Sequence, residues 1–239
     1  MPKDTTGSVE AIRQLRVVRT SVVKARTAAL AQLGELITTA PAVVRERFGP
    51  RASLHERATL CARLRPNLTQ LHQPVEAARV ALRSLGQRIV ALDAEIAALE
   101  AQLTALVTAV APRTTALLGL GCLTVAQLLI TLGQNADRIR DEAAFAHVCG
   151  VSPIPASSGK TSRHRLNRGG DREANSALYL VAVCRLRYCE RTRAYAARRT
   201  AEGRSKPEIL RCLKRYVARE VYASLRADLA LHTPRLTTA

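Results

Sequence analysis

Apolar residues recur at intervals of three and four along two long stretches of the chain, which predicts two long amphipathic helices. The first stretch covers residues 9–37 and contains few helix breakers. The second is more regular, with apolar positions at Val75, Ala78, Leu82, Leu85, Ile89, Leu92, Ile96, Leu99, Leu103, Leu106 and Val110. A repeat sustained over about five heptads predicts a coiled-coil seam on a helix about 50 Å long. Either another subunit or the 9–37 helix folded back would cover this seam.

Shorter helices are predicted elsewhere, separated by glycine and proline. Ser53 is a candidate N-cap for a helix that ends near Leu64, before Pro66. Further helices are expected over residues 137–148, with Phe145 inward, and over 173–187, 192–202 and 208–231. Because only the stretch around residues 146–153 lacks a helical pattern, we predict a mainly α fold. It consists of a long coiled-coil arm followed by a compact helical domain.

A tight helical hairpin is predicted around Gly119-Leu-Gly121, with its second helix starting near Thr124. This element is similar to a helix-hairpin-helix, in which turn amides and a helix N-terminus hold a nucleic-acid phosphate. On that interpretation Gly119, Gly121 and Thr124 contact DNA or RNA. A structural corner without a ligand is the alternative.

The charge balance points to a polyanionic partner. The 239 residues include 37 Lys and Arg against 19 Asp and Glu, a formal net charge of +18. Residues 160–219 alone hold 17 basic and 5 acidic residues, mostly on helical sequence. Tyr179, Tyr188 and Tyr195 lie among these cations, and we interpret them as core or hydrogen-bonding residues rather than stacking platforms. A folded basic face is therefore expected.

Membrane and metal functions find no support in the sequence. No apolar run approaches the ~18 residues of a spanning helix, and residues 1–7 do not resemble a signal peptide. The six cysteines form no C-x-x-C pair and no Cys/His spacing typical of zinc. We therefore expect no membrane partner, no metal ligands, and buried thiols in a cytoplasmic protein.

Candidate chemistry is concentrated in residues 150–171, where two serines in a glycine- and proline-rich turn are followed by cations. Ser157 and Ser158 are candidate nucleophiles towards a phosphodiester, and nearby cations can neutralise phosphate. The predicted phosphate contacts are Lys160, Arg163, Arg165, Arg168 and Arg172. A basic, solvated loop is the alternative interpretation.

Several spaced motifs occur in one order: Gly119-x-Gly121, Phe145-Ala-x-x-Cys-Gly150-Val-Ser-Pro153, Ser157-Ser158-Gly159-Lys160, Arg165-Leu-Asn-Arg-Gly-Gly170-Asp171 and Ala174-Asn-Ser-Ala-Leu-Tyr179. Together they resemble the C-terminal domain of the insertion sequence 110/116/902 family of transposases. The resemblance implies a DNA transposase or recombinase of an insertion element. Ser158, directly before Gly159, would then attack the DNA phosphate, with Ser157 as the second choice.

In that family an acidic, RNase H-like domain that binds Mg²⁺ precedes the first basic helix, whereas this chain opens with that helix. The resemblance therefore implies a truncated transposase that binds nucleic acid but does not cut alone, with no cofactor of its own. Its domains would be a basic helical segment (1–70), a coiled-coil arm (71–111) and a serine-bearing domain (112–239).

The partners implied are DNA at element ends and target, a structured guide RNA in some members, and further copies of the chain through the seam. Two other hypotheses stay open. One is a non-catalytic nucleic-acid-binding protein, and the other is a coiled-coil oligomerisation protein with incidental charge.

Overall fold

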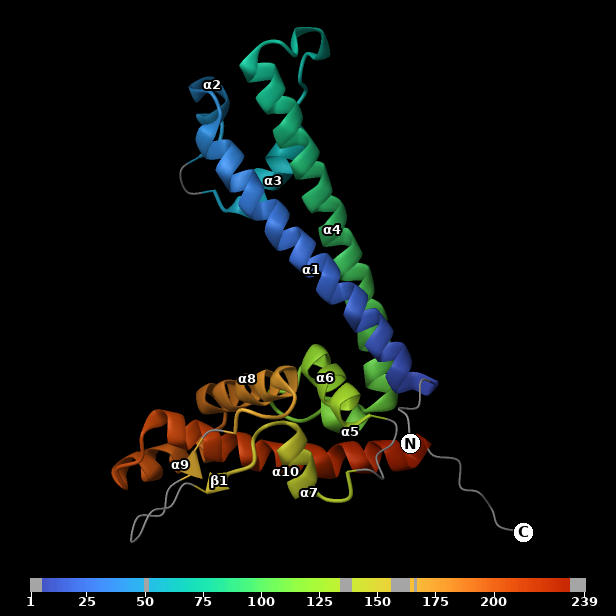
Figure 1. The fold of residues 1–239 in the computed structure, drawn as a ribbon, viewed down its shortest axis with the longest axis vertical. Helices are drawn as coiled ribbons and strands as arrows, with labels where there is room; N and C mark the ends of the chain where they lie inside the picture. Colours follow the sequence, from blue (N-terminus) through green and yellow to red (C-terminus); the bar gives the residue numbers. More distant parts are fainter. Residues whose placement is uncertain (1–5, 50–51, 134–138, 156–163, 166, 233–239) are drawn as a thin grey trace, which may run out of the picture. The chain divides into compact units, whose positions relative to one another are not determined.

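The computed structural model describes residues 6–49, 52–133, 139–155, 164–165 and 167–232, and over these the fold is mainly α, as predicted. The elements, in chain order (Figure 1), are α1 (Gly7–Thr39), α2 (Ala42–Arg45), α3 (Leu54–Ala62), the short 3₁₀ turn η1 (Leu68–Gln70), α4 (Pro74–Val110), α5 (Pro112–Thr115), α6 (Cys122–Leu132), α7 (Glu142–Val148), β1 (Ile154–Pro155), β2 (His164–Arg165), α8 (Arg172–Tyr188), α9 (Glu190–Ala201) and α10 (Lys206–His232).

The chain divides into two compact units. The first, which we call the arm unit, is Leu15–Gln102. The second, the site unit, combines Met1–Gln14 with Leu103–Ala239. The three-part division expected from the sequence stays a prediction.

Within the arm unit, α1 and α4 lie side by side and bury one apolar cluster between them and α3 (Figure 1). Leu33 of α1 and Leu82 and Ile89 of α4 are fully buried in it. Ion pairs join the same helices, from Arg19 to Glu100 at 2.5 Å and from Arg26 to Asp93. Of the two partners considered for the seam, α1 of the same chain therefore covers it here. The coiled-coil geometry and the oligomer stay predictions.

The start of α3 follows the sequence pattern closely. Ser53 caps the helix, since its hydroxyl accepts from the backbone N–H of Glu56 while the Glu56 carboxylate accepts from the backbone N–H of Ser53. This reciprocal capping box satisfies two otherwise unpaired donors. It confirms the predicted N-cap.

The packing of α3 on α4 depends on Gly86. A Cβ at this position would lie 2.5 Å from the backbone N of Ala62 and 2.6 Å from the carbonyl O of Ala58. The two backbones can approach this closely only because no side chain stands between them.

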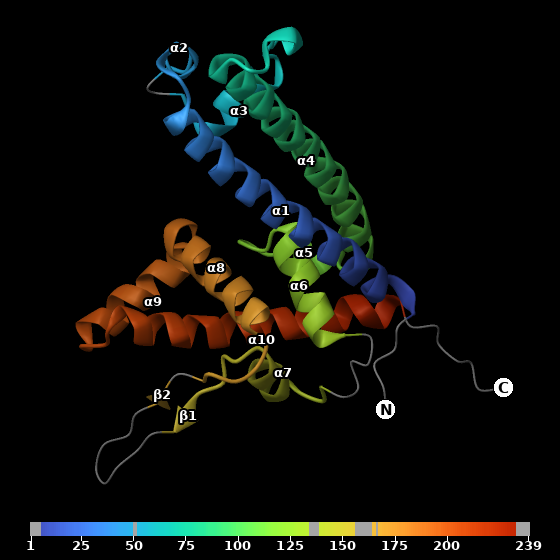
Figure 2. The ribbon, with the colours of Figure 1, turned by 45° about the horizontal axis from the view of Figure 1, so that its top comes forward.

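The site unit is built around α10. Helix α8 packs on one side of α10 and α7 on another (Figure 2). Phe145 of α7 is fully buried, as expected, and its ring lies 5.6 Å from that of Tyr222 on α10. Leu178 and Val181 of α8 are also fully buried. These contacts hold the helices that surround the site.

The cysteines partly follow expectation. All six are free thiols, but only Cys61 and Cys149 are buried, whereas Cys122, Cys184, Cys189 and Cys212 are half-buried. Burial raises the pKa of the Cys149 thiol to about 12, so it stays protonated.

In the part of the chain that the structure describes, no helix is long and apolar enough to cross a membrane.

Candidate functional site

The turn after α7 is locked against the turn before α8 by two glycines. Gly150 and Gly170 have φ angles of +65° and +83°, in the left-handed region. A Cβ on Gly170 would lie 2.5 Å from the carbonyl O of Val148, and one on Gly150 would lie 2.5 Å from that of Gly169. The backbone N–H of Asp171 donates to the same Val148 carbonyl at 2.7 Å. Two motifs far apart in sequence are thus in direct backbone contact.

Asn175 connects this double turn to α10. Its side-chain amide donates to the carbonyl O of Gly150 at 2.7 Å. Its Oδ1 accepts from Nζ of Lys214 at 2.8 Å. Lys214 is only 7% exposed, and burial lowers its pKa, with Arg211 contributing in the same direction. A buried ammonium is therefore held beside the turn by an amide oxygen.

Asp171 fastens the start of α8. One carboxylate oxygen accepts from the backbone N–H groups of Glu173 at 2.8 Å and Ala174 at 3.1 Å. The other oxygen accepts from the hydroxyl of Thr131 at 2.7 Å and the amide of Gln127 at 3.1 Å, both on α6. The acidic residue of the Gly-Gly-Asp motif therefore caps α8 and ties it to α6.

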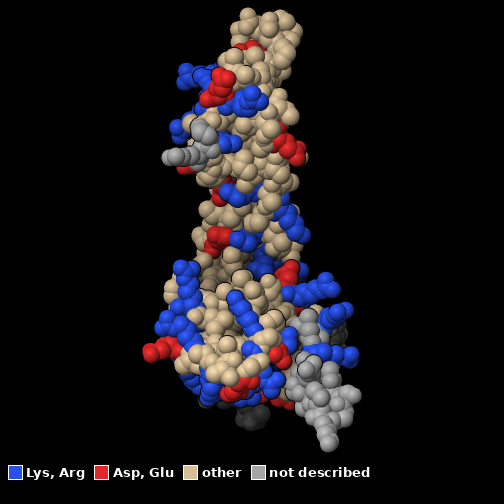
Figure 3. Space-filling model, turned by 90° about the vertical axis from the view of Figure 1, so that its left-hand side faces the viewer, with Lys and Arg blue, Asp and Glu red and all other residues tan. Residues whose placement is uncertain are grey.

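A pocket of about 600 Å³ opens beside the double turn. Its walls come from residues 150–153, from Arg165 of β2 with Asn167, and from α9 and α10 with their connection. Seven cations and one carboxylate line it: Arg165, Arg199, Arg204, Arg211, Lys214, Arg215, Arg219 and Glu208. Figure 3 shows that one face of the site unit carries many more Lys and Arg side chains than Asp and Glu. The pocket is strongly electropositive.

Carboxylates around the pocket compensate only part of this charge. Glu142 of α7 pairs with both Arg215 and, at 3.4 Å, Arg219. The hydrogen bond from Arg215 is the main reason that the pKa of Glu142 lies below its ordinary value. Glu208 lies 3.7 Å from Arg204 and accepts from the hydroxyl of Ser205 at 2.8 Å. One carboxylate shared by two arginines leaves net positive charge for an anionic ligand.

The short hairpin of β1 and β2 flanks the pocket. Pro155 pairs with His164 and Ile154 with Arg165, in antiparallel register. The predicted nucleophiles Ser157 and Ser158 and the predicted contacts Lys160 and Arg163 occur in sequence between the two strands and lie outside the described residues. The structure thus places both flanks of the serine segment at the pocket.

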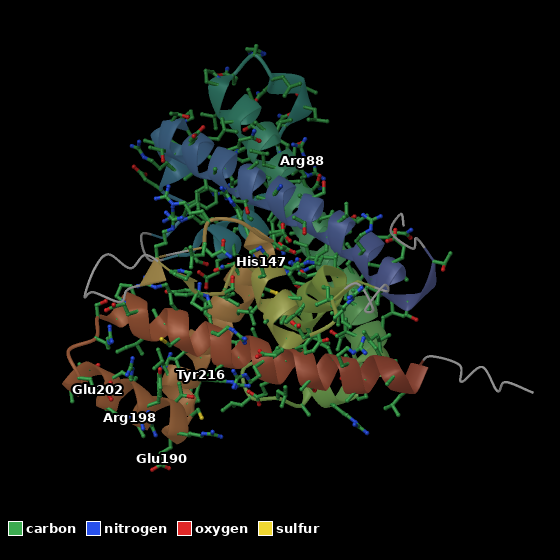
Figure 4. The ribbon with its side chains drawn as sticks, turned by 60° about the horizontal axis from the view of Figure 1, so that its bottom comes forward. Arg88, His147, Glu190, Arg198, Glu202 and Tyr216 are labelled. Atoms are coloured by element: carbon green, nitrogen blue, oxygen red, sulfur yellow. The ribbon has the colours of Figure 1, made fainter. Side chains whose placement is uncertain are left out.

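The hydroxyl of Ser152 lies in the pocket wall. Ser152 shares a 3.3 Å hydrogen bond with Nδ1 of His147 on α7 and accepts from the side-chain amide of Asn167 at 3.1 Å. His147 is exposed on α7 (Figure 4). The interactions hold Ser152 next to the strand that leads into the serine segment.

The structure brings Arg165 into the pocket, whereas Arg168 and Arg172 are exposed and are not part of its lining. The predicted hairpin contacts Gly119, Gly121 and Thr124 do not line the pocket either. A Cβ on Gly119 would lie 3.4 Å from Cys184, so this glycine, with a φ of +85°, packs against α8. Gly121 is the N-cap of α6 and has open space around it. Phosphate binding by this hairpin stays a prediction.

Most of the pocket was not predicted from the sequence. The cations of α10 and Tyr216 were not among the predicted site residues, although Arg211, Arg215 and Arg219 are spaced four apart and so share one helix face. Of the three tyrosines interpreted as core or hydrogen-bonding residues, Tyr195 is half-buried, but Tyr179 and Tyr188 are exposed.

The described residues offer no ligand set for the Mg²⁺ that the family resemblance implies. Among them no group of three or more His, Cys, Asp and Glu side chains is placed to hold a metal ion. The nearest carboxylates to the pocket are engaged with arginines or helix N-termini.

Comparison with known proteins shows which part of the chain is similar to a described family. Residues 112–197 match the family model described as Transposase IS116/IS110/IS902 family, and this match runs from the start of α5 through the double turn into α9. The similarity to this transposase family therefore covers about a third of the chain and does not include α10.

Two curated relatives match at 30% identity or slightly above. One is the Insertion element IS900 uncharacterized 42 kDa protein of Mycobacterium paratuberculosis, 30% identical over 122 residues, or 51% of this chain and 30% of that protein. The other is the Insertion element IS110 uncharacterized 43.6 kDa protein of Streptomyces coelicolor, 32% identical over 118 residues, or 48% of this chain and 29% of that protein. The matched segment thus spans less than a third of either relative.

Proposed function

We propose that this chain binds DNA at insertion-element ends through the electropositive pocket and supplies a serine hydroxyl to DNA strand exchange. The pocket carries the proposal, because its cations gather at the flanks of the segment that contains Ser157 and Ser158. The positive charge offsets phosphate charge and places the phosphodiester beside that segment.

In the proposed step, Oγ of Ser158 bonds to phosphorus while one bridging oxygen of the phosphodiester leaves. The proton lost by the serine ends on the leaving oxygen, so the products are a serine phosphodiester and a free alcohol on the DNA. Since the bond to phosphorus is exchanged rather than hydrolysed, a DNA hydroxyl can reverse the step and join a new strand. Pocket arginines stabilise the negative charge that develops on the phosphoryl oxygens.

Duplex binding tests the first part. Fluorescence anisotropy with a labelled duplex at low salt should show binding that weakens steeply as salt rises. Arg165→Ala should weaken it several-fold and lower the salt slope by about 1, as expected for one lost phosphate contact. Arg88→Ala is the matched control, since Arg88 is exposed on α4 in the arm unit (Figure 4). Equal losses in both variants would mean that binding follows overall charge and not the pocket.

Covalent trapping tests the serine. Suicide DNA substrates that carry element ends, incubated with Mg²⁺ and the chain alone, should give no protein–DNA adduct, because a chain without the acidic domain is expected not to cut by itself. When a protein that supplies the acidic RNase H-like domain is added, an adduct of this chain should form, and Ser158→Ala should abolish it. Loss of the adduct in Ser157→Ala with retention in Ser158→Ala would identify Ser157 as the nucleophile. If the chain binds DNA but forms no adduct even with the acidic domain present, the alternative function is favoured, a non-catalytic nucleic-acid-binding protein whose serines are turn residues.

We also propose two further partners for the chain. A structured guide RNA shares the phosphate chemistry of DNA and would compete for the same cations. Because α1 covers the α4 seam within the chain, a second copy would pair through the faces of α1 and α4 that stay exposed, at Val17, Val18 and Val90. Competition by structured RNA against labelled duplex, and sedimentation of the chain at several concentrations, test these two partners separately.

A further inference from the structure

One exposed aromatic side chain in the pocket, that of Tyr216, has no role in binding a duplex backbone. Tyr216 lines the pocket and is 53% exposed, a large exposed fraction for a tyrosine ring. Figure 4 shows Tyr216 on α10, on the side that faces α9. Phosphates and sugars along a duplex groove offer no flat apolar partner for such a ring.

The ring of Tyr216 is held in a fixed orientation. It meets Tyr195 of α9 edge to face, with ring centroids 5.6 Å apart and an interplanar angle of 86°. Tyr195 is half-buried, and the guanidinium carbon of Arg198 lies over its ring, 5.5 Å from the ring centroid. Contact with a half-buried neighbour restricts the rotamers of Tyr216, so the entropy cost of binding against it is small.

The α10 residues that line the pocket form two stripes along the helix, one apolar and one cationic. Ile209, Cys212 and Tyr216 follow the spacing i, i+3, i+7 and form an apolar stripe. Arg211, Arg215 and Arg219 follow the spacing i, i+4, i+8 and form an adjacent cationic stripe. A ligand that fits both stripes has a flat apolar part beside an anionic part.

Lys214 adds a buried charge at the cationic side. It lines the pocket at 7% exposure, and its hydrogen bond to Asn175 uses one of three ammonium donors. Within the described part of the chain, the structure pairs Lys214 with no carboxylate. An anionic ligand would supply the charge that compensates this ammonium.

We propose that the pocket binds one unstacked nucleotide of single-stranded DNA, with its base on the apolar stripe at Tyr216 and its phosphates on the cationic stripe and Lys214. The volume of about 600 Å³ lies in the range of pockets that hold cofactor-sized ligands. The inference deepens the proposed function, since strand exchange needs bases released from pairing near the serine. The base is bound through its ring face, so sequence preference from this contact is weak.

Stacking on Tyr216 is tested with a 12-nucleotide DNA strand that carries one 2-aminopurine, and with a blunt duplex as second probe. Binding of the strand to the wild-type chain should change the 2-aminopurine fluorescence. Tyr216→Ala should weaken single-strand binding by about 5-fold to 100-fold, the loss expected for one base–aromatic stack. Tyr216→Phe should keep wild-type affinity, because it retains the ring.

The controls separate stacking from folding. Tyr188→Ala removes a tyrosine that is 63% exposed and is not part of the pocket lining, so it should leave single-strand binding unchanged. Duplex binding by Tyr216→Ala reports whether the variant still folds, and it should match wild type.

Three outcomes would overturn the inference: equal losses of single-strand and duplex binding in folded Tyr216→Ala, no loss of either, or an equal loss in Tyr188→Ala. A single strand of RNA that binds more tightly, with the same dependence on Tyr216, would overturn the assignment to DNA. If the wild-type chain binds no nucleic acid, the proposed function fails as a whole. Duplex binding that depends on Arg165 but no effect at Tyr216 would overturn only this inference.

Discussion

The ammonium of Lys214 on α10 donates a 2.8 Å hydrogen bond to Oδ1 of Asn175 on α8, next to the turn that leads into the serine segment. The amide of Asn175 in turn holds the carbonyl of Gly150. A group placed to bind an anion is therefore also part of the support of the site. Changes at Lys214 should act on both binding and turn geometry.

The protonation of Lys214 should make DNA binding sensitive to alkaline pH. Burial lowers the pKa of Lys214 below its ordinary value of 10.5, so its attraction for phosphate is complete below the lowered pKa and is lost as pH rises through it. Between the lowered pKa and 10.5 the unfolded chain holds more protons, so the free energy of unfolding should rise with pH there. Titration of duplex affinity from about pH 7 to about pH 10 should show a steeper loss for wild type than for Lys214→Arg. Lys206→Arg, at an exposed lysine, should behave as wild type.

Gly170→Ala should damage the double turn. The added Cβ meets the Val148 carbonyl at 2.5 Å, in addition to the strain of a φ of +83°. We expect a loss of about 3 kcal/mol in the free energy of unfolding, measured by urea denaturation. Gly203→Ala is the control, since its φ of +78° is similar but nothing lies within 4 Å of the added atom. It should cost only the left-handed strain, about 1–2 kcal/mol, and equal losses would show that the contact with Val148 is unimportant.

Gly86→Ala should destabilise the arm unit by about 2–3 kcal/mol, because the new methyl group must push α3 away from α4. Gly34→Ala provides a helical control in the same unit, where the nearest atoms belong to the flexible Leu54 side chain at 3.4 Å. That change should stabilise by up to about 1 kcal/mol through helix propensity. Thermal unfolding followed by circular dichroism measures both. A Gly86→Ala variant as stable as wild type would contradict the close approach of the two helices.

Asp228→Asn should destabilise the site unit. Asp228 is fully buried, and its carboxylate accepts from the backbone N–H groups of Arg113 and Thr114 and from the Thr114 hydroxyl at 2.7 Å. An asparagine would present an NH₂ group to at least one of these donors, at a cost of about 2–3 kcal/mol. Ser224→Ala removes only one hydroxyl partner of Thr114 and should cost about 1 kcal/mol or less by the same denaturation experiment. Similar costs in the two variants would argue against Asp228 as the anchor of α5.

The helices could be predicted from the sequence because each one depends on local information. The apolar repeat that ends at Val110 and the N-cap at Ser53 both act within a few turns, and α4 and α3 follow them. The burial of Phe145 followed from the same periodicity.

The pocket could not be predicted in this way. Arg165 and Arg215 come together only because Gly150 and Gly170 allow two backbones to touch, and no periodic pattern records that contact. The sequence did locate the serine segment and its basic surroundings. It could not show that Tyr216 and Lys214, separated by one residue on α10, would both reach one pocket, because neighbours at this spacing ordinarily point to different sides of a helix.

The close contact of the double turn with α8 also predicts how sequences of this kind can diverge. A side chain at position 150 or 170 has no space unless the opposing carbonyl moves, and the carbonyl of Gly150 is in turn bound by Asn175. Positions 150, 170, 175 and 214 should therefore change together or not at all among related chains. In a relative that replaces one of them and keeps the other three, we expect the helices to form but the pocket to be absent.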